Sequence, residues 1–228
     1  MIKSLNMHQE NTNKVAEEQN TKKELKGIEK YLSFVLELVK IAIIAIIIVA
    51  PIRYFLFQPF IVSGASMSPN FASKDYLIVD EISYRFSTPQ RGDVIVFDAS
   101  FVKDLSGKYN YLGQKFIKRV IGLPGETVNI LDGQVEVIKD GKTVVLDEKY
   151  LPSDLKTYGY DGYTFSFMPE SVTLKSDQYF VMGDNRSGSY DSRMWGVVSK
   201  EYIIGKAFLR VLPITNLSEI SRPVYQSN

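Results

Sequence analysis

A short stretch of small residues, Ser63-Gly64-Ala65-Ser66-Met67-Ser68-Pro69, holds the groups in this sequence that are best suited to chemistry. Gly64 allows a positive φ or a close backbone approach, and Pro69 fixes the direction in which the chain leaves. A serine on such a turn can present its hydroxyl as a nucleophile while nearby backbone N–H groups face an oxyanion. An ordinary Ser/Gly/Pro turn is the commoner meaning of this pattern, so Ser66 needs a partner base.

Composition narrows the choice of that base. The 228 residues include one histidine, His8, and no cysteine. A Ser-His-Asp triad, a histidine-rich zinc site, a cysteine nucleophile and a disulfide are therefore excluded from the region around Ser66. The base must be Lys, Asp, Glu, Tyr or a chain terminus, and the known serine hydrolase variants point to lysine. The net charge of +1 gives no indication of a nucleic-acid partner.

Lys118 is the candidate lysine, in an apolar run beside Arg119. A lysine in such a run normally points to solvent, where its pKa of ~10.4 keeps it protonated and unable to accept a proton. A lysine base works best with a pKa near ~7–8, which requires a preference of roughly 4 kcal/mol for the neutral amine. Burial shifts a lysine in that direction, and Phe116, Ile117 and Val120 are available to bury it.

The elements that must position these residues begin with an apolar segment at 31–57. Its centre, Ile41–Ala50, contains no polar residue, and the whole run reaches the ~20 residues that cross a bilayer. A buried core helix would normally keep a polar stripe, and a cleaved signal peptide would lie nearer residue 1. We therefore expect an uncleaved membrane anchor that follows a polar tail at 1–30.

Basic residues predict the orientation of this anchor. Only Arg53 follows the span closely, whereas five lysines precede it closely: Lys14, Lys22, Lys23, Lys26 and Lys30. The positive-inside rule then places the tail in the cytoplasm and residues 58–228 outside, in a single-pass protein of the cell membrane that contacts lipid. Aromatic residues after the span resemble an interfacial belt (Tyr54, Phe55, Phe57 and Phe60).

Beyond Ser66 the pattern is typical of β structure. Short β-branched and aromatic runs occur at 76–79, 93–97, 116–121, 127–131, 134–138, 142–146, 178–182 and 203–211. Asp132-Gly133 and Asp140-Gly141 separate neighbouring runs, and such pairs are strong hairpin signals. The sequence thus predicts a mainly β protein, in which one N-terminal transmembrane helix precedes an antiparallel β domain. We expect a small, looser insert at about 148–176.

Five segments together resemble the bacterial type I signal peptidases, the membrane-bound Ser-Lys endopeptidases that cleave signal peptides from exported proteins. They occur in the family's order and cover most of residues 32–211. They are the anchor, Ser63–Pro69, Arg91–Phe97, Lys118–Glu126, and Gly183–Arg186 with Ser189, Asp191, Ser192 and Arg193. The single anchor and the small insert resemble the Gram-positive branch. Asn70 stands where threonine is usual, a difference expected to affect only local packing.

The resemblance implies a role for particular residues. Ser66 would be the nucleophile, Lys118 the general base, and Ser189 the residue that holds the lysine amine. The Ser66 N–H would form part of the oxyanion hole, with Gly64 where other members place a serine. A structural ion-pair network would contain Arg119, Asp184, Asp191 and Arg193. Shallow pockets for small residues would be lined by Phe60, Val62, Met67, Leu77, Val96 and Ile117.

The implied activity is acyl transfer to water, acting on preproteins at Ala-X-Ala sites without a metal or another cofactor. Two alternatives share parts of this pattern. A self-cleaving repressor-type Ser-Lys peptidase would carry a DNA-binding helix-turn-helix in place of the apolar span. A catalytically idle homologue that acts in membrane-anchored assembly or binding would be expected to lack Ser66 or Lys118.

Overall fold

The chain divides into two units, residues 1–53 and 54–228, each described here by itself. The computed structural model describes residues 30–49, 57–103, 110–158 and 171–225. Within the first unit, the helix Lys30–Val49 has the length and apolar composition to cross a membrane. The predicted tail before residue 30 and the far end of the predicted anchor, 50–56, lie outside the described residues.

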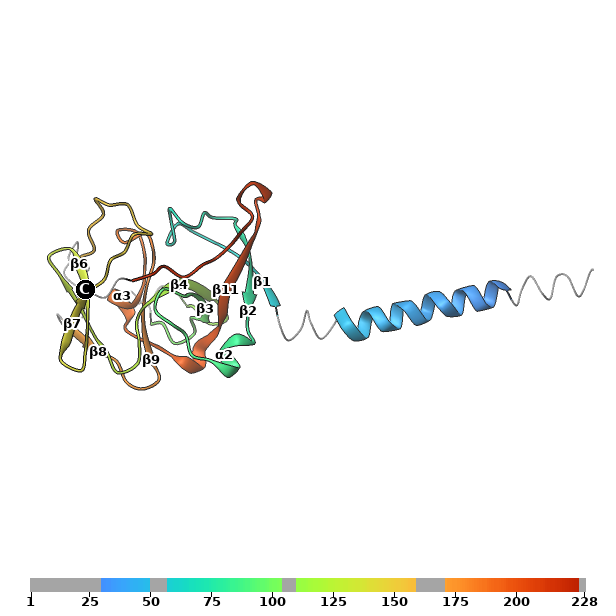
Figure 1. Ribbon diagram of the computed structural model, residues 1–228, viewed down its shortest axis with the longest axis horizontal. Coiled ribbons are helices and arrows are strands. Elements are labelled where there is room, and N and C mark those ends of the chain that lie inside the picture. The colour runs from blue at the N-terminus through green and yellow to red at the C-terminus, as the bar shows by residue number, and fades with distance from the viewer. Residues whose placement is uncertain (1–29, 50–56, 104–109, 159–170, 226–228) are drawn as a thin grey trace, which may run out of the picture. The chain divides into compact units, whose positions relative to one another are not determined.

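The second unit is built from two antiparallel sheets (Figure 1). The larger sheet follows the order β1-β2-β11-β3-β4-β9-β10, with β12 paired to β11, and the smaller follows β7-β6-β5-β8. The strands of the larger sheet are β1 (Phe57–Ile61), β2 (Tyr76–Asp80), β3 (Val94–Asp98), β4 (Lys115–Gly122), β9 (Gln178–Met182), β10 (Val198–Ser199), β11 (Ile203–Leu212) and β12 (Ser218–Glu219). Those of the smaller sheet are β5 (Thr127–Leu131), β6 (Gln134–Lys139), β7 (Lys142–Val145) and β8 (Ser171–Thr173).

Helices in this unit are short and occupy connections between strands. They are the α-helices α2 (Ser83–Phe86) and α3 (Ser192–Trp195), and the 3₁₀ turns η1 (Lys200–Tyr202) and η2 (Ile214–Asn216). The predicted mainly β class, with one apolar helix ahead of an antiparallel domain, is therefore confirmed.

The two predicted hairpins are also confirmed. Asp132-Gly133 joins β5 to β6, and Asp140-Gly141 joins β6 to β7. Both residues of each pair have positive φ, at 51° and 81° in the first turn and 50° and 74° in the second. A two-residue hairpin turn of this kind matches the right-handed twist of its strands.

Strand β1 is the main element that the sequence pattern did not predict. Phe57 is its first residue, so the apolar helix cannot extend to that position, and Phe60 belongs to the same strand. β1 pairs with β2 along one side only and forms an edge of the larger sheet. Five residues of mixed polarity with a central proline carry little strand signal, although proline is tolerated on an edge.

The core comprises three buried groups of apolar side chains. The first, which we call the site core, lies under β1 to β4 and β11 and contains Val62, Met67, Phe71, Leu77, Val79, Val94, Val96, Ile117 and Ala207. The second lies against the smaller sheet and contains Ile121, Val128, Val135, Val137, Leu146, Leu174, Phe180 and Met182. The third contains Ile95, Phe97, Val120, Tyr179, Val181 and Val198. Because β4 contributes to all three, its residues from Ile117 onward are buried on both faces.

Candidate active site

Ser66 lies in the turn between β1 and β2, and its backbone is held from outside that turn. Gly64 has a φ of +87°, a left-handed conformation that favours glycine. Asn185 donates twice, from its backbone N–H to the Ser66 carbonyl and from Nδ2 to the Ala65 carbonyl, both at 3.1 Å. These two bonds fix the backbone on which the Ser66 hydroxyl is carried.

Lys118 reaches this hydroxyl from the middle of β4. Its Nζ donates to Ser66 Oγ at 2.9 Å and to the Ile117 carbonyl at 2.9 Å. The lysine is 4% exposed, and this burial lowers its pKa to about 8, against the weaker raising effects of Asp191 and Asp184. An amine with this pKa is partly neutral near physiological pH, so it can accept a proton from Ser66.

Ser189 is buried beside this pair, but it does not make the expected bond. Its Oγ has no hydrogen-bond partner among the described residues, so the predicted contact with the Lys118 amine is not formed. Ser189 and the Ser66 carbonyl pack closely against Gly183, which is possible because glycine has no Cβ. A Cβ at position 183 would lie 2.2 Å from both Ser189 Oγ and the Ser66 carbonyl oxygen. We call Ser63–Pro69 the nucleophile turn, after the role expected for Ser66. Ser189 therefore lies near this turn with a buried hydroxyl that is available for a bond.

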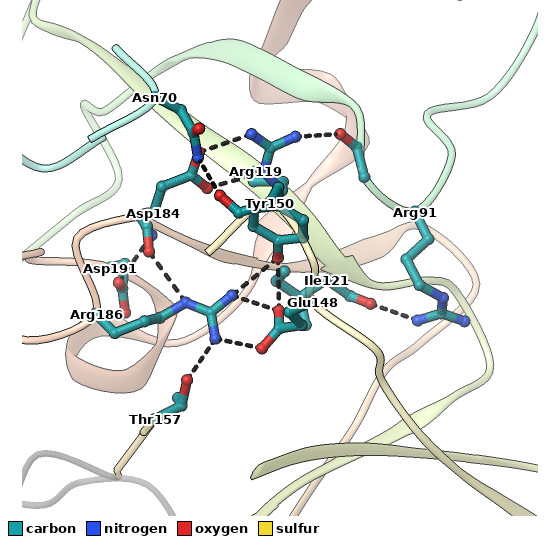
Figure 2. Close-up of polar contacts among 12 residues, drawn as sticks. Asn70, Arg91, Arg119, Ile121, Glu148, Tyr150, Thr157, Asp184, Arg186 and Asp191 are labelled. Carbon is teal, nitrogen blue, oxygen red and sulfur yellow. Dashed lines mark hydrogen bonds and ion pairs between the residues drawn. The ribbon is translucent and has the colours of Figure 1, made fainter. Parts of the chain in front are cut away.

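The four charged residues of the expected network form two ion pairs, Arg119–Asp184 and Arg193–Asp191, and Figure 2 shows the first of them. Arg119 binds Asp184 through two bonds of 2.8 and 2.7 Å, and Arg193 binds Asp191 through two of 2.8 Å. Alternation along β4 sends Lys118 and Arg119 to opposite faces, so one strand supplies both the lysine and an ion-pair partner. Asp191 also accepts from the Gly183 N–H at 3.0 Å, which ties the second pair to the loop beside Ser66.

Asn70 has a larger role than the local packing that we expected. Its Nδ2 donates to Asp184 Oδ2 and to the Tyr150 carbonyl, both at 2.9 Å (Figure 2). The turn that carries Ser66 is thereby linked to the Arg119–Asp184 pair.

The first part of the predicted insert is anchored more firmly than a loose segment would be. Arg186, with a fully buried side chain, binds both carboxylate oxygens of Glu148, Thr157 Oγ1 and the Tyr150 hydroxyl (Figure 2). Burial alone would lower the pKa of Arg186, but the bonds and charge of Glu148 raise it above its usual value. Residues 159–170 of the predicted insert lie outside the described residues, whereas Ser171–Thr173 near its end form β8, which pairs with β5 in the smaller sheet.

An open cleft beside Ser66 and Lys118 is the place where a substrate can reach them. Its walls come from β1, the nucleophile turn, the start of β4 and two loops, and include Phe60, Ile61, Tyr111, Phe116, Ile117, Gly188 and Tyr190. Two of the six predicted pocket residues, Phe60 and Ile117, line this cleft. The other four, Val62, Met67, Leu77 and Val96, are at most 2% exposed and belong to the site core beneath it.

Sequence reasoning missed three supporting side chains, those of Asn70, Asn185 and Arg186. Asn185 and Arg186 stand in the Gly183–Arg186 motif, which was a signal that the loop mattered but not of what each side chain binds. Among the described residues, no three His, Asp or Glu side chains gather in a way that could hold a metal ion.

The chain is similar in sequence to proteins of one known family. A family model described as signal peptidase, peptidase S26, matches residues 35–212. A signal peptidase I from Leptolyngbya laminosa is 38% identical over 180 residues, which cover 79% of this chain and 81% of the relative. One from Bacillus amyloliquefaciens is 35% identical over 186 residues, which cover 81% of this chain and 92% of the relative. A solved signal peptidase I from Enterococcus faecalis is 33% identical, with a TM-score of 0.39, and covers 53% of this chain and 97% of that one.

The relatives thus include cyanobacterial as well as Bacillus proteins, a wider range than the expected likeness to the Gram-positive branch. The match over most of the chain, at these identities, identifies a serine peptidase, as the Ser66 and Lys118 motifs predicted. The chain belongs to the signal peptidase family, peptidase S26.

Proposed function

We propose that this chain cleaves signal peptides from exported preproteins with Ser66 as nucleophile and Lys118 as general base. The observation that carries the proposal is the 2.9 Å contact between Lys118 Nζ and Ser66 Oγ, made by a buried lysine with a pKa of about 8. A solvated lysine would be almost wholly protonated near pH 7 and could not serve as this base. The relatives named signal peptidase I support preproteins as the substrate class.

The reaction follows from this geometry as two acyl transfers. In the first, neutral Lys118 takes the Ser66 proton while Oγ forms a bond to the scissile carbonyl carbon. The C–N bond then breaks, the leaving amine takes the proton from the lysine ammonium, and the signal-peptide side stays esterified to Ser66. In the second, Lys118 takes a proton from water while the water oxygen forms a bond to the ester carbonyl carbon. The bond from that carbon to Ser66 Oγ then breaks, Oγ takes the proton back from the lysine ammonium, and the acid is released. None of these steps uses a metal or another cofactor.

The developing oxyanion needs a donor, and the Ser66 N–H is the proposed one. Gly64 contributes through its backbone: its φ of +87° shapes the turn, and it has no side chain to enter the cleft. The two Asn185 bonds to the Ala65 and Ser66 carbonyls support this role, because they hold the adjoining peptide groups in place before substrate arrives.

Ser189 is proposed to support the lysine during the reaction. A buried hydroxyl without a partner costs about 1–3 kcal/mol, so a bond formed later in the cycle would recover that energy. When Lys118 is protonated by Ser66, its ammonium has three donors and needs acceptors beyond the Ile117 carbonyl. Ser189 Oγ, packed beside the Ser66 carbonyl, is suited to that role.

Substrate is proposed to bind as an extended strand in the cleft between β1 and the start of β4. Among the described strands, β1 pairs only with β2, so its other side can accept main-chain bonds from a peptide. Phe60 and Ile117 are apolar cleft walls supported from below by the site core. Such a shallow apolar cleft favours small side chains before the cut, as in an Ala-X-Ala site.

The helix Lys30–Val49 is proposed as a single membrane anchor in contact with lipid. Lysines ahead of it favour a cytoplasmic N-terminus and a catalytic unit on the outer side of the cell membrane. This topology suits the substrate, because a signal peptide is cut after the preprotein has crossed the membrane.

The test is cleavage of a preprotein with an Ala-X-Ala site by the full chain in detergent micelles, with the cut located by mass. Ser66→Ala should remain folded and lose cleavage, whereas Ser73→Ala, at an exposed serine in the same loop, should keep wild-type cleavage. Wild-type-like cleavage by Ser66→Ala would refute the assignment of the nucleophile. Labelling of wild type, but not of Ser66→Ala, by a serine-acylating inhibitor would distinguish the peptidase from an idle homologue.

A further inference from the structure

The segment after β11 folds back over the domain, beyond the residues that match the family model. β12 pairs with β11, and the Ile220 N–H then donates to the Phe208 carbonyl at 2.9 Å. Ile220 packs against the site core, whereas Tyr225 packs against the second core at the smaller sheet. Figure 1 shows this dark red segment crossing from β11 toward β6. We call residues 218–225 the return strap.

The middle of the strap rests on the loop that leads into β3. Pro223 packs against Gly92 so closely that a Cβ there would lie 2.8 Å from Pro223 Cδ. Arg222 Nε donates to Asp93 Oδ1 at 2.9 Å. Asp93 also accepts from Tyr84, Gln90 and Lys206, so Arg222 is one of several partners and the Pro223 contact is the more specific one.

The far end of the strap rests on Tyr150. The Tyr225 and Tyr150 rings meet edge to face with centroids 6.4 Å apart. The Tyr150 ring has a second partner, Arg119, whose guanidinium lies 4.2 Å from the ring centroid. An edge-to-face pair and a cation–π contact on one ring restrict where that ring can lie.

The Pro223 and Tyr225 contacts both lead to Arg119, the residue that follows Lys118 on β4. Arg119 Nη1 donates to the carbonyl of Gly92, which Pro223 covers, at 2.9 Å (Figure 2). Its other nitrogens bind Asp184, and the next residue, Asn185, holds the carbonyls of the nucleophile turn. The strap therefore supports Arg119 from two sides, and Arg119 joins the strand of the lysine to the loop that holds the serine.

We infer that the return strap is a positioning element of the peptidase site, an inference that rests on the proposed function. Strap residues do not line the cleft beside Ser66. Loss of the Pro223 and Tyr225 contacts should therefore affect the alignment of Ser66 with Lys118 more than the binding of substrate. A small misplacement of catalytic groups costs rate steeply, up to about 10²-fold per ångström.

The test measures cleavage of one preprotein with an Ala-X-Ala site by wild type and four variants in detergent micelles. One variant ends at Ser221, and the other three are full-length chains with Tyr225→Ala, Tyr225→Phe or Val224→Ala. Val224 is the matched control, because it lies in the same strap and is 82% exposed. Fluorescence of Trp195, the single tryptophan, reports the folded fraction of each variant under the assay conditions.

We expect kcat to fall by about tenfold in the shortened chain and in Tyr225→Ala, with KM within about twofold of wild type. Tyr225→Phe keeps the ring and should recover most of the rate, and Val224→Ala should match wild type. Wild-type kcat in both Tyr225→Ala and the shortened chain would overturn the inference, as would a loss of rate no greater than the loss of folded protein. An inactive wild-type chain would instead overturn the proposed function, and this inference with it.

Discussion

Replacing Lys118 by methionine should abolish cleavage and yet make the folded chain more stable near neutral pH. Activity is lost because Lys118 is the basic side chain that bonds to Ser66 Oγ among the described residues, and a positioned base contributes about 10²–10⁴-fold. Stability is gained because the structure buries an amine whose charged form it disfavours. The pKa of Lys118 is about 8 in the folded chain against 10.5 for a solvated lysine.

The sign and size of the stability difference between Lys118→Met and wild type follow from proton linkage. Between pH 8 and 10.5 the unfolded chain keeps a proton on this lysine that the folded chain has released, so stability rises with pH across that window. Below pH 8 Lys118 is protonated in both the folded and the unfolded chain. Its burial then lowers the stability of the folded chain by ~3 kcal/mol, a cost that no longer changes with pH. Loss of the two Nζ bonds, to the Ile117 carbonyl and to Ser66 Oγ, removes ~2 kcal/mol of the gain. Lys118→Met should thus be more stable than wild type by ~1 kcal/mol at pH 7 and lose this advantage toward pH 10.5.

Two measurements on the same proteins check this reasoning. Denaturant unfolding, followed by the fluorescence of Trp195 between Phe97 and Phe101, gives the stability difference from pH 7 to 10.5. Single-turnover cleavage gives the pH profile, which should rise about tenfold from pH 7 to 9 in wild type as the neutral fraction of Lys118 grows. Lys139→Met, which removes an exposed lysine at the end of β6, should change neither result.

Lys118→Arg distinguishes a base from a structural cation. Arginine keeps the charge and nearly the length but stays protonated at any usable pH, so this variant should be as inactive as Lys118→Met. Substantial cleavage by Lys118→Arg, a wild-type profile without an alkaline rise, or a Lys118→Met chain that is less stable than wild type at pH 7 would refute the reasoning.

Three further predictions concern topology, the cleft and the insert. Protease added to cells stripped of their wall should digest the domain after residue 57 and leave the N-terminal tail intact, and the reverse pattern would contradict the proposed orientation. Ile117→Ala should admit larger residues before the cut, which product sequencing can show. Leu77→Ala, in the site core, should lower the free energy of unfolding by ~2–5 kcal/mol and leave the cleavage-site preference unchanged, as denaturant unfolding and product sequencing can show. Arg186→Met should destabilise the chain by ~3–5 kcal/mol because it removes the cation that binds the partly buried Glu148 carboxylate. A smaller loss in the double variant with Glu148→Gln would support this reason, whereas an additive loss would contradict it.

The candidate chemistry and the local structure follow from residue types and their spacing. With one histidine, placed in the N-terminal tail, only a lysine or an acidic or phenolic group could assist Ser66. The hairpins at Asp132 and Asp140 followed from turn chemistry, and the longer strands followed from their β-branched and aromatic runs. These features depend on neighbours along the chain, which a pattern of residue types reports directly.

Which buried residues contact one another depends on how distant segments pack in the folded domain. Residue type does not separate Phe60 and Ile117, which line the cleft, from Leu77 and Val96, which lie beneath it. All four are apolar, and their exposure is set by how β1 and β4, several strands apart in the sheet, approach each other. The partition of the charges into two ion pairs and the anchoring by Arg186 have the same origin. Contacts between distant segments depend on sheet order and curvature, which the local periodicity of a strand does not encode.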